Sequence, residues 1–420
     1  MTIPIRLLPT LSLLAALTLP PLRSAEPPTK PKIRAITGFI TIDATSYPAQ
    51  IEEAVAFLSQ VRSAVQAAGY EVSGIRISTQ PFPEYTRGLS HADALSVLQG
   101  IDQLAGKLKF APNIGPAMMA DDDVGSIDLL TEVLSMPGSR LIANVVTASD
   151  DGIHWNAVRQ AARIIHAVGQ RSPHGQGNFN FAAIAMLKPY GPFYPGAWHP
   201  GGGPRSFAIG LESANVVMDV FGREHDPRTA GEALAAALAV HARAVEAAAM
   251  NAADGSGWTY AGIDPTPAPA GQVSIGAAIE SFIGGPFGSP GTETAAGIIT
   301  RAVKAVPVKQ TGYSGLMIPV LEDAVLTRRW TEQTYGLDAI LAYSAVCAGG
   351  VDTVPLAGDT SEESIARIIG DVATLAFKWN KPLAARLLPA PGKKAGEMTE
   401  FSGALGNALI QPLVGTVRSR

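Results

Sequence analysis

The chain has 420 residues, of which 47% are hydrophobic and only 16% are charged, and its formal net charge at pH 7 is −4. This composition can bury a substantial core. Lys and Arg are scattered and form no basic run interleaved with aromatic residues, so no nucleic-acid partner is expected. The 43 glycines and 32 prolines are spread between apolar segments, which indicates a turn-rich globular fold and not disorder.

The first 25 residues have the plan of a secretory signal. Arg6 precedes an apolar run over residues 7–19, and small residues then lead to a cleavage site near Ala25. The run is shorter than the roughly 20 apolar residues of a membrane span, so no stable membrane insertion is expected. We predict export to the periplasm or the extracellular space, with a retained N-terminal anchor as the alternative. Residues 26–32 are predicted to be a linker and residues 33–420 a single domain.

Predicted strands and helices alternate from the start of this domain. Residues 33–42 alternate in the manner of a strand, residues 48–68 carry apolar side chains at helical spacing, and residues 72–78 form the next strand. Such a β–α–β opening predicts an α/β fold. Further strands are predicted at 141–147, 179–186, 206–211, 351–355 and 384–388, and further helices at 92–108, 127–134, 154–168, 227–251, 273–282, 294–306, 337–347 and 361–377.

Several motifs are missing from the sequence. It contains no P-loop, no Gly-x-Gly-x-x-Gly after the first strand, no His-Glu-x-x-His and no Gly-x-Ser-x-Gly. No organic cofactor is therefore expected. The run Asp121–Asp123 offers oxygen ligands for a divalent metal ion, with a solvated turn as the alternative, so metal dependence stays open.

A loop over residues 188–204 collects aromatic residues and a histidine. Phe193, Tyr194 and Trp198 are suited to stack on a flat ligand while His199 donates or accepts a proton. The alternative is a packed surface loop. Glu212, just after the strand at 206–211, is a candidate for the same space or an exposed carboxylate at a strand end.

A second candidate region lies at residues 311–323. Tyr313 and Ser314 stand between glycines and precede a predicted apolar strand that ends in Glu322 and Asp323. Because neighbours on a strand point to opposite sides, only one of the two acids is expected to face a site. Capping of a helix over 324–330 is the alternative for this pair.

Two more carboxylates stand in loops of small or rigid residues. Asp264 precedes Pro265, which can hold its carboxylate in place, although the same position suits an Asp that caps a turn. Glu400 stands among small residues at 396–406 that either let the backbone approach a ligand or serve tight packing.

Taken in order, these motifs resemble those of the domain-of-unknown-function 711 family, also called uncharacterised protein family 0210. The resemblance covers most of the chain beyond the signal and is weakest in the N-terminal third. The segments that carry it are Asn178-Phe179-x-Phe181, Pro192-Phe193-Tyr194-Pro195, Ile263-Asp264 before Pro-Thr-Pro, Gly291-Thr292 at a helix start, the Tyr-Ser-Gly-x-x-Ile-Pro-Val-x-Glu-Asp stretch at 313–323, Cys347, Asp352 and the Glu400-Phe401-x-Gly-x-x-Gly close.

The resemblance implies a fold: a ten-stranded α/β barrel surrounded by helices, similar to that of pyruvate formate-lyase. It implies no activity. A glycyl radical enzyme is not expected, because the chain has no C-terminal radical glycine motif and its one cysteine, Cys347, stands in an apolar run that favours a buried thiol. With one cysteine the fold has no internal disulfide.

The leading functional hypothesis is an extracytoplasmic hydrolase or lyase that acts on a small polar, carbohydrate-like substrate. It requires His199 and the acids Asp264, Glu400 and Glu322 or Asp323 to meet in one pocket and perform acid–base chemistry. The alternatives are a ligand-binding envelope protein without catalysis and a structural or partner-binding one. The sequence leaves open whether the protein forms a homo-oligomer. The substrate-binding candidates are Phe193, Tyr194, Trp198, Glu212, Thr292, Tyr313 and Ser314.

Overall fold

The computed structural model describes residues 29–123 and 126–413. The predicted signal and the first residues of the linker lie outside these ranges. One ten-stranded sheet organises the described chain, in the order β8-β7-β1-β2-β3-β4-β6-β10-β9, with β5 paired to β4. The strands are β1 (Lys32–Ile40), β2 (Ile75–Thr79), β3 (Phe110–Pro116), β4 (Ile142–Ser149), β5 (Gly152–Ile153), β6 (Phe181–Ala185), β7 (Ser206–Glu212), β8 (Thr259–Asp264), β9 (Gly350–Ala357) and β10 (Leu383–Ala390).

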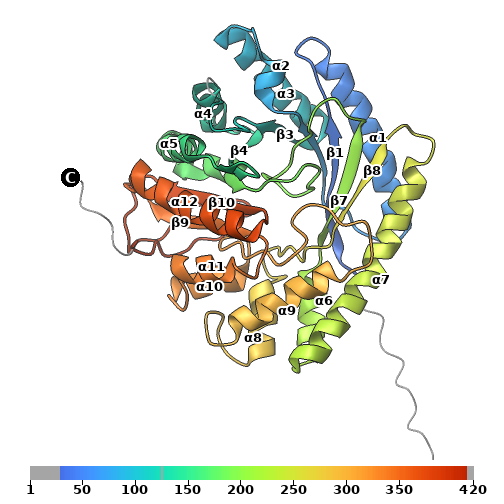
Figure 1. Cartoon of the computed structure of the whole chain (residues 1–420), viewed down its shortest axis with the longest axis vertical. Coiled ribbons are helices and arrows are strands. Elements are labelled where there is room, and N and C mark those ends of the chain that lie inside the picture. Colours follow the sequence, from blue (N-terminus) through green and yellow to red (C-terminus); the bar gives the residue numbers. More distant parts are fainter. Residues whose placement is uncertain (1–28, 124–125, 414–420) are drawn as a thin grey trace, which may run out of the picture.

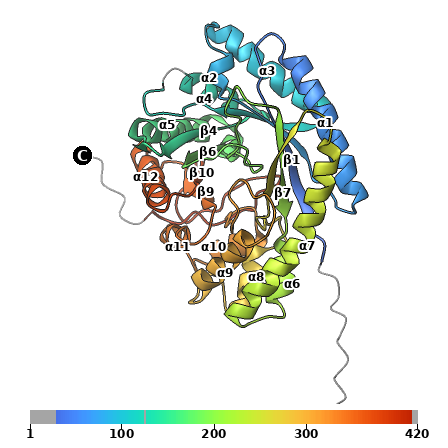
Figure 2. The same ribbon diagram turned by 45° about the vertical axis from the view of Figure 1, so that its right-hand side comes forward.

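Helices connect these strands and lie mainly on the outer side of the curved sheet, while long loops run through its inner side (Figures 1 and 2). The predicted α/β class, with a ten-stranded sheet and surrounding helices, is confirmed. The helices are α1 (Tyr47–Ala67), α2 (Phe82–Tyr85), α3 (His91–Leu108), α4 (Ile127–Ser135), α5 (Trp155–Arg171), α6 (Ala214–Phe221), α7 (Pro227–Ala253), α8 (Ile275–Ile283), α9 (Thr292–Lys304), α10 (Ala324–Thr331), α11 (Leu337–Tyr343) and α12 (Glu362–Trp379), with a 3₁₀ segment η1 (Pro173–Asn180) before β6.

The sheet contains two sets of strands with opposite directions. Strands β1, β2, β3, β4 and β6 are parallel to one another. Beyond β1, strands β7 and β8 run the other way, and beyond β6 so do β10 and β9. Between the edge strands, Gln310 bridges to Ile263 of β8 and Pro319 bridges to Asp352 of β9. The segment from 310 to 319 therefore lies between the two edges.

The outer helices bury their apolar faces against the sheet and one another. In α5, for example, Val158, Ile164, Ile165 and Val168 are buried, and each such side chain contributes about 1.5–3 kcal/mol when fully buried. Helix α7 begins with Asp226 accepting from the backbone N–H groups of the first turn. Among the described residues, α7 is the one helix long and apolar enough to span a membrane by length and composition. Here it packs against α1, α6, α9 and β8.

Besides the short elements α2 and β5 and the edge strand β8, which were not predicted, the structure differs from the sequence prediction at β3, at α6 and before Glu322. Strand β3 was not predicted because Pro112, Gly115 and Pro116 are poor strand formers, yet β2 and β4 pair with it on both sides. Helix α6 was also missed. The apolar strand predicted before Glu322 is wrong. Apart from the bridge at Pro319, the backbone of residues 316–321 bonds to scattered partners, which include the Thr300 and Thr353 hydroxyls and the backbones of Ala348, Asp352 and Gly406.

Candidate functional site

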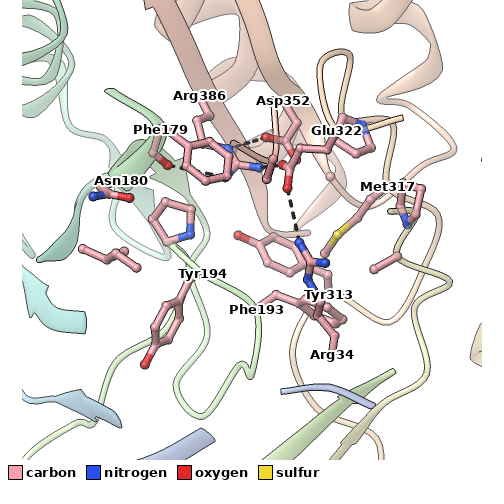
Figure 3. A pocket seen from close by; sticks show the side chains of 18 of the residues that line it. Arg34, Phe179, Asn180, Phe193, Tyr194, Tyr313, Met317, Glu322, Asp352 and Arg386 are labelled. Atoms are coloured by element: carbon pink, nitrogen blue, oxygen red, sulfur yellow. Dashed lines mark hydrogen bonds and ion pairs between the residues drawn. The ribbon is translucent and has the colours of Figure 1, made fainter. Parts of the chain in front are cut away.

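A cavity of about 200 Å³ lies on the inner side of the curved sheet (Figure 3). Its charged lining comes from the strands: Arg34 of β1, Arg76 of β2, Asp352 of β9 and Arg386 of β10, with Glu322 from the loop before α10. The rest of the wall is mainly aromatic and apolar. It includes Phe179, Phe193, Tyr194, Ala268, Tyr313, Met317 and Pro319.

Arg386 joins the two carboxylates of the cavity. Its Nε donates to Asp352 Oδ1 at 2.6 Å, and its Nη2 donates to Glu322 Oε1. Its guanidinium carbon also lies 4.9 Å from the centre of the Phe179 ring. Burial raises the pKa of Asp352 above its ordinary value, an effect that Arg386 offsets in part and the neighbouring Glu322 increases. Asp352 and Glu322 thus share one buried cation but stand in different surroundings.

Glu322 is also bonded by Arg34 of β1, on the side away from Arg386 (Figure 3). Arg34 Nη2 lies 3.4 Å from Glu322 Oε2, and Arg34 Nη1 donates to Glu212 Oε2 of β7 at 3.0 Å. Both oxygens of Glu322 are therefore bonded to guanidinium groups, one from β1 and one from β10 (Figure 3). This chain of ion pairs joins segments that lie up to 288 residues apart in the sequence.

Two β-bulges lie at these charged residues. The pairing of β1 with β7 shifts between Ile33 and Ala35, around Arg34. The pairing of β10 with β9 shifts between Ala385 and Leu387, around Arg386, and Thr353 opposite has a positive φ of 49°. A bulge interrupts the alternation of side chains and turns one of them toward a new direction. The two bulges help to aim Arg34 and Asp352 at the same space.

The middle of the loop over residues 188–204 lies inside the curved sheet, with residues 191–193, 195–197 and 199 buried, whereas Lys188, Pro200 and residues 202–204 are exposed. The carbonyl of Pro192 accepts from Thr37 Oγ1 at 2.9 Å, and the carbonyl of Pro195 accepts from Asn113 and Asn144 at 3.0 and 2.8 Å. Strands β1, β3 and β4 thereby hold the loop, and its Phe193 and Tyr194 line the cavity.

Arg76 rests against this inserted loop. Its guanidinium carbon lies 4.7 Å from the centre of the Tyr194 ring, and its Nη1 is 3.4 Å from the Pro192 carbonyl. Burial, together with the positive charge of Arg34, lowers the pKa of Arg76 to about 10. Within the described ranges, Arg76 forms no ion pair with a carboxylate.

Asp264 positions the loop that carries Tyr313. The carboxylate is fully buried at the end of β8 and accepts hydrogen bonds from the backbone N–H groups of Thr266, Tyr313 and Ser314. Burial raises its pKa to about 6, although these hydrogen bonds act in the opposite direction. Tyr313 lines the cavity, whereas Asp264 itself lies behind the wall. Ser314 donates its hydroxyl to the Thr311 carbonyl at 2.9 Å.

His199 is held within its own loop. It is buried, its Nδ1 accepts from the Gly201 N–H at 3.0 Å, and its Nε2 lies 3.4 Å from the Pro204 carbonyl. Burial lowers the pKa of His199. Neither His199 nor the half-buried Trp198 lines the cavity.

The remaining candidates lie at three other places. Asp323 is buried and accepts from N–H groups at the starts of α8 and α10, so it joins two helices. Thr292 bonds to the Ser289 carbonyl at the start of α9. Glu400 is exposed and accepts from Lys393 Nζ at 2.6 Å. Of the sequence candidates, Glu322, Phe193, Tyr194 and Tyr313 line the common cavity, and Glu212 pairs with Arg34 behind it.

Potential metal ligands do not gather in the described ranges: no group of three or more His, Cys, Asp or Glu side chains is placed there to hold an ion. Asp121 accepts from the N–H groups of Asn156 and Ala157 at the start of α5, and Asp123 accepts from those of Met119 and Ala120. Cys347 is free and buried, as its apolar neighbours indicated.

Arg34, Arg76 and Arg386 are not among the sequence candidates, because they lie in strands and most candidates stand in predicted loops. The signal that could have found them is a single arginine inside an otherwise apolar strand, since such a charge is rarely buried without a partner. Asp352 was noted only as part of the family pattern.

The fold and the cavity define a mixed α/β protein with a charged pocket on the inner side of one curved sheet. The chain belongs to the family described as Uncharacterised ACR (DUF711), whose model matches residues 28–402. A UPF0210 protein of Pyrobaculum aerophilum is 31% identical over 381 residues, which are 85% of this chain and 83% of the relative. Another from Desulforudis audaxviator is 33% identical over 283 residues, 64% of this chain and 63% of the relative. The predicted family is thus confirmed.

Proposed function

We propose that this protein is an enzyme, a hydrolase or lyase, that performs acid–base chemistry on a small polar molecule bound in the cavity. The observation that carries the proposal is the pairing of Glu322 and Asp352 on Arg386 inside a concave, largely apolar wall. Hydrolysis and elimination need one group that gives a proton and another that takes one, and two carboxyl groups in unlike surroundings can divide these roles.

Asp352 is suited to the role of proton donor. Its burial favours the protonated carboxyl group, as the raised pKa indicates. Glu322 is the candidate acceptor, because it lies at the cavity wall between two guanidinium groups. The aromatic side chains of Phe193, Tyr194 and Tyr313 provide faces against which a ring or a carbohydrate-like substrate can pack. His199, Asp264 and Glu400 are not part of this proposal, because each makes its contacts elsewhere.

The experiment starts from compounds that raise the unfolding temperature of the protein in a screen of sugars, sugar acids and esters. Each stabilising compound is incubated with the wild type, Glu322→Gln and Asp352→Asn, and its conversion is followed by NMR. We expect the wild type to convert at least one compound, and both variants to lose at least a hundredfold in rate. Equal conversion by all three proteins would remove these carboxylates from the mechanism.

A ligand-binding protein without catalysis is the second candidate. The observation that favours it is the saturation of Glu322, both of whose oxygens are already bonded to arginines. If the wild type binds compounds and returns every one of them unchanged, this second function replaces the first.

We also propose that the sheet closes as in the barrel of pyruvate formate-lyase. Support comes from the two oppositely directed sets of strands and from the bridges of Gln310 and Pro319 to the two edge strands. A superposition of an experimental structure on such barrels, with strand order and direction compared, tests this proposal.

Export is proposed from the sequence of the first 25 residues. The test is expression of the full chain in a bacterium with separation of cell compartments and N-terminal sequencing. A mature chain that starts near Glu26 and lies outside the cytoplasm is expected, and an intact N-terminus in the cytoplasm contradicts the proposal.

A further inference from the structure

The cavity contains one arginine whose charge is not matched by a carboxylate partner. Arg34 pairs with Glu212 and Glu322, and Arg386 pairs with Glu322 and Asp352. Arg76, in contrast, has a single long hydrogen bond to a carbonyl, at 3.4 Å, and the face of Tyr194. A guanidinium group carries five N–H donors, so most of its hydrogen-bonding capacity remains for a ligand.

From this geometry we infer that the natural ligand of the cavity carries a carboxylate group and that Arg76 binds it. The inference rests on the proposed function in that it concerns the same cavity, and it specifies the class of substrate as a small monocarboxylate. Arginine suits this task because its planar fork matches the two oxygens of a carboxylate.

The charge of the cavity favours a monoanion. Arg34 and Arg386 are paired with Glu212, Glu322 and Asp352, whereas Arg76 makes no ion pair with any of these carboxylates. A carboxylate matches the single positive charge of Arg76, whereas a phosphate dianion brings a second negative charge into a cavity that already contains Glu322 and Asp352. Desolvation in the cavity makes such a mismatch costly.

The size and rigidity of the cavity agree with a small ligand. A volume of about 200 Å³ is below the range of about 300–1,000 Å³ that is common for drug-sized ligands. The guanidinium of Arg76 is also fixed before a ligand arrives. It lies on the Tyr194 ring, and the next residue, Pro195, is bonded to Asn113 and Asn144 of neighbouring strands. Such preorganisation reduces the entropy lost on binding.

The test is calorimetric titration of the full-length protein with glycolate, lactate and benzoate, each compared with its neutral primary amide, and with inorganic phosphate. The variants are Arg76→Gln and Arg76→Lys, with Arg163→Gln as a matched control, since Arg163 pairs with Asp128 on the exposed surface. Arg76→Lys keeps the charge and serves as a second variant if Arg76→Gln does not fold.

We expect at least one carboxylate to bind the wild type at least tenfold more tightly than its amide. Arg76→Gln should weaken this binding tenfold or more, Arg76→Lys should weaken it less, and Arg163→Gln should leave it unchanged. The inference is overturned if no carboxylate binds, if acid and amide bind equally, if Arg76→Gln binds like the wild type, or if phosphate binds more tightly than every carboxylate.

The outcome is separable from that of the proposed reaction. A wild type that binds a carboxylate through Arg76 and converts no compound contradicts the enzymatic function and leaves this inference standing. Conversion of a neutral compound at full rate by Arg76→Gln supports the reaction and overturns the inference.

Discussion

Asp352 and Arg386 face each other across a β-bulge between β9 and β10, with Asp352 Oδ1 2.6 Å from Arg386 Nε. The same arginine holds Glu322, so one guanidinium group serves as the counter-charge of two buried acids. Removing one member of a buried ion pair leaves its partner without compensation in a poorly solvated place, which makes Arg386 the residue on which the cavity most depends.

Replacement of Arg386 by glutamine is therefore expected to lower the free energy of unfolding by about 3–5 kcal/mol, the usual cost of breaking a buried pair. Urea denaturation followed by circular dichroism measures the change. The control is Arg163→Gln, which breaks an exposed pair with Asp128 and should cost less than about 1 kcal/mol. Similar values for the two variants would contradict the role given to Arg386.

Gly312 is expected to tolerate no side chain. A Cβ there would lie 2.4 Å from Asp264 Oδ2, and the residue has a positive φ of 69°. Gly255 has nearly the same φ, 67°, but nothing within 4 Å of an added Cβ. Alanine at Gly255 should cost about 1–2 kcal/mol for the backbone alone, and alanine at Gly312 about 1–3 kcal/mol more for the overlap. Equal losses of unfolding free energy in urea denaturation would show that the Asp264 side chain moves away from the added Cβ without destabilising the protein.

The stability of the protein is expected to depend on the ionisation of Asp264. Its pKa is about 6 in the folded chain, against an ordinary value of 3.8. Because the folded state binds this proton more tightly, the contribution to stability is fully present below about pH 4 and is lost as the pH rises through 6. The difference is worth roughly 3 kcal/mol, at 1.36 kcal/mol for each pKa unit.

Asp264→Asn cannot titrate and isolates this effect. When unfolding free energies are measured from pH 4 to 7, the wild type should lose stability relative to Asp264→Asn as the pH rises. A difference that stays constant, or that grows in favour of the wild type, would show that the backbone N–H donors keep Asp264 ionised throughout.

Replacement by glutamine is expected to destabilise the protein at Glu322 but not at Glu400. Glu322→Gln leaves Arg34 and Arg386 with a neutral partner and should lower the unfolding temperature clearly. Glu400→Gln changes only an exposed contact with Lys393 and should leave the unfolding temperature and the binding of carboxylates unchanged. Thermal unfolding of the two variants side by side measures this difference. A loss of carboxylate binding in Glu400→Gln alone would show that the binding site is at the exposed Glu400 and not in the cavity.

The sequence predicted most elements of the fold, because the periodicity of apolar residues reports which face of a helix or strand is buried. It placed the strand at 33–42 and the helix at 48–68 within one or two residues of both ends of β1 and of α1. The sequence did not predict β3, because its prolines are poor strand formers, although β2 and β4 pair with it on both sides. It also predicted a strand in the apolar run at 316–321, which forms a buried loop.

For the site, the sequence identified groups but not their neighbours. Asp264, Asp323 and His199 were selected because polar residues beside Gly and Pro in loops often carry function. In the folded chain they bond to nearby backbone groups instead. Glu322 lies in the cavity because Arg34 and Arg386, each isolated in an apolar strand, reach it from opposite sides.

The family, the α/β class and the buried cysteine were determined by the sequence alone, since motif order, periodicity and local polarity are properties of neighbouring residues. Which charges meet was decided only by the tertiary structure. Arg34, Glu322 and Arg386 are separated by tens to hundreds of residues, and the curvature of the sheet and its two bulges bring them together. The physical reason is that an ion pair depends on distance in space and on burial, and neither can be read from local sequence.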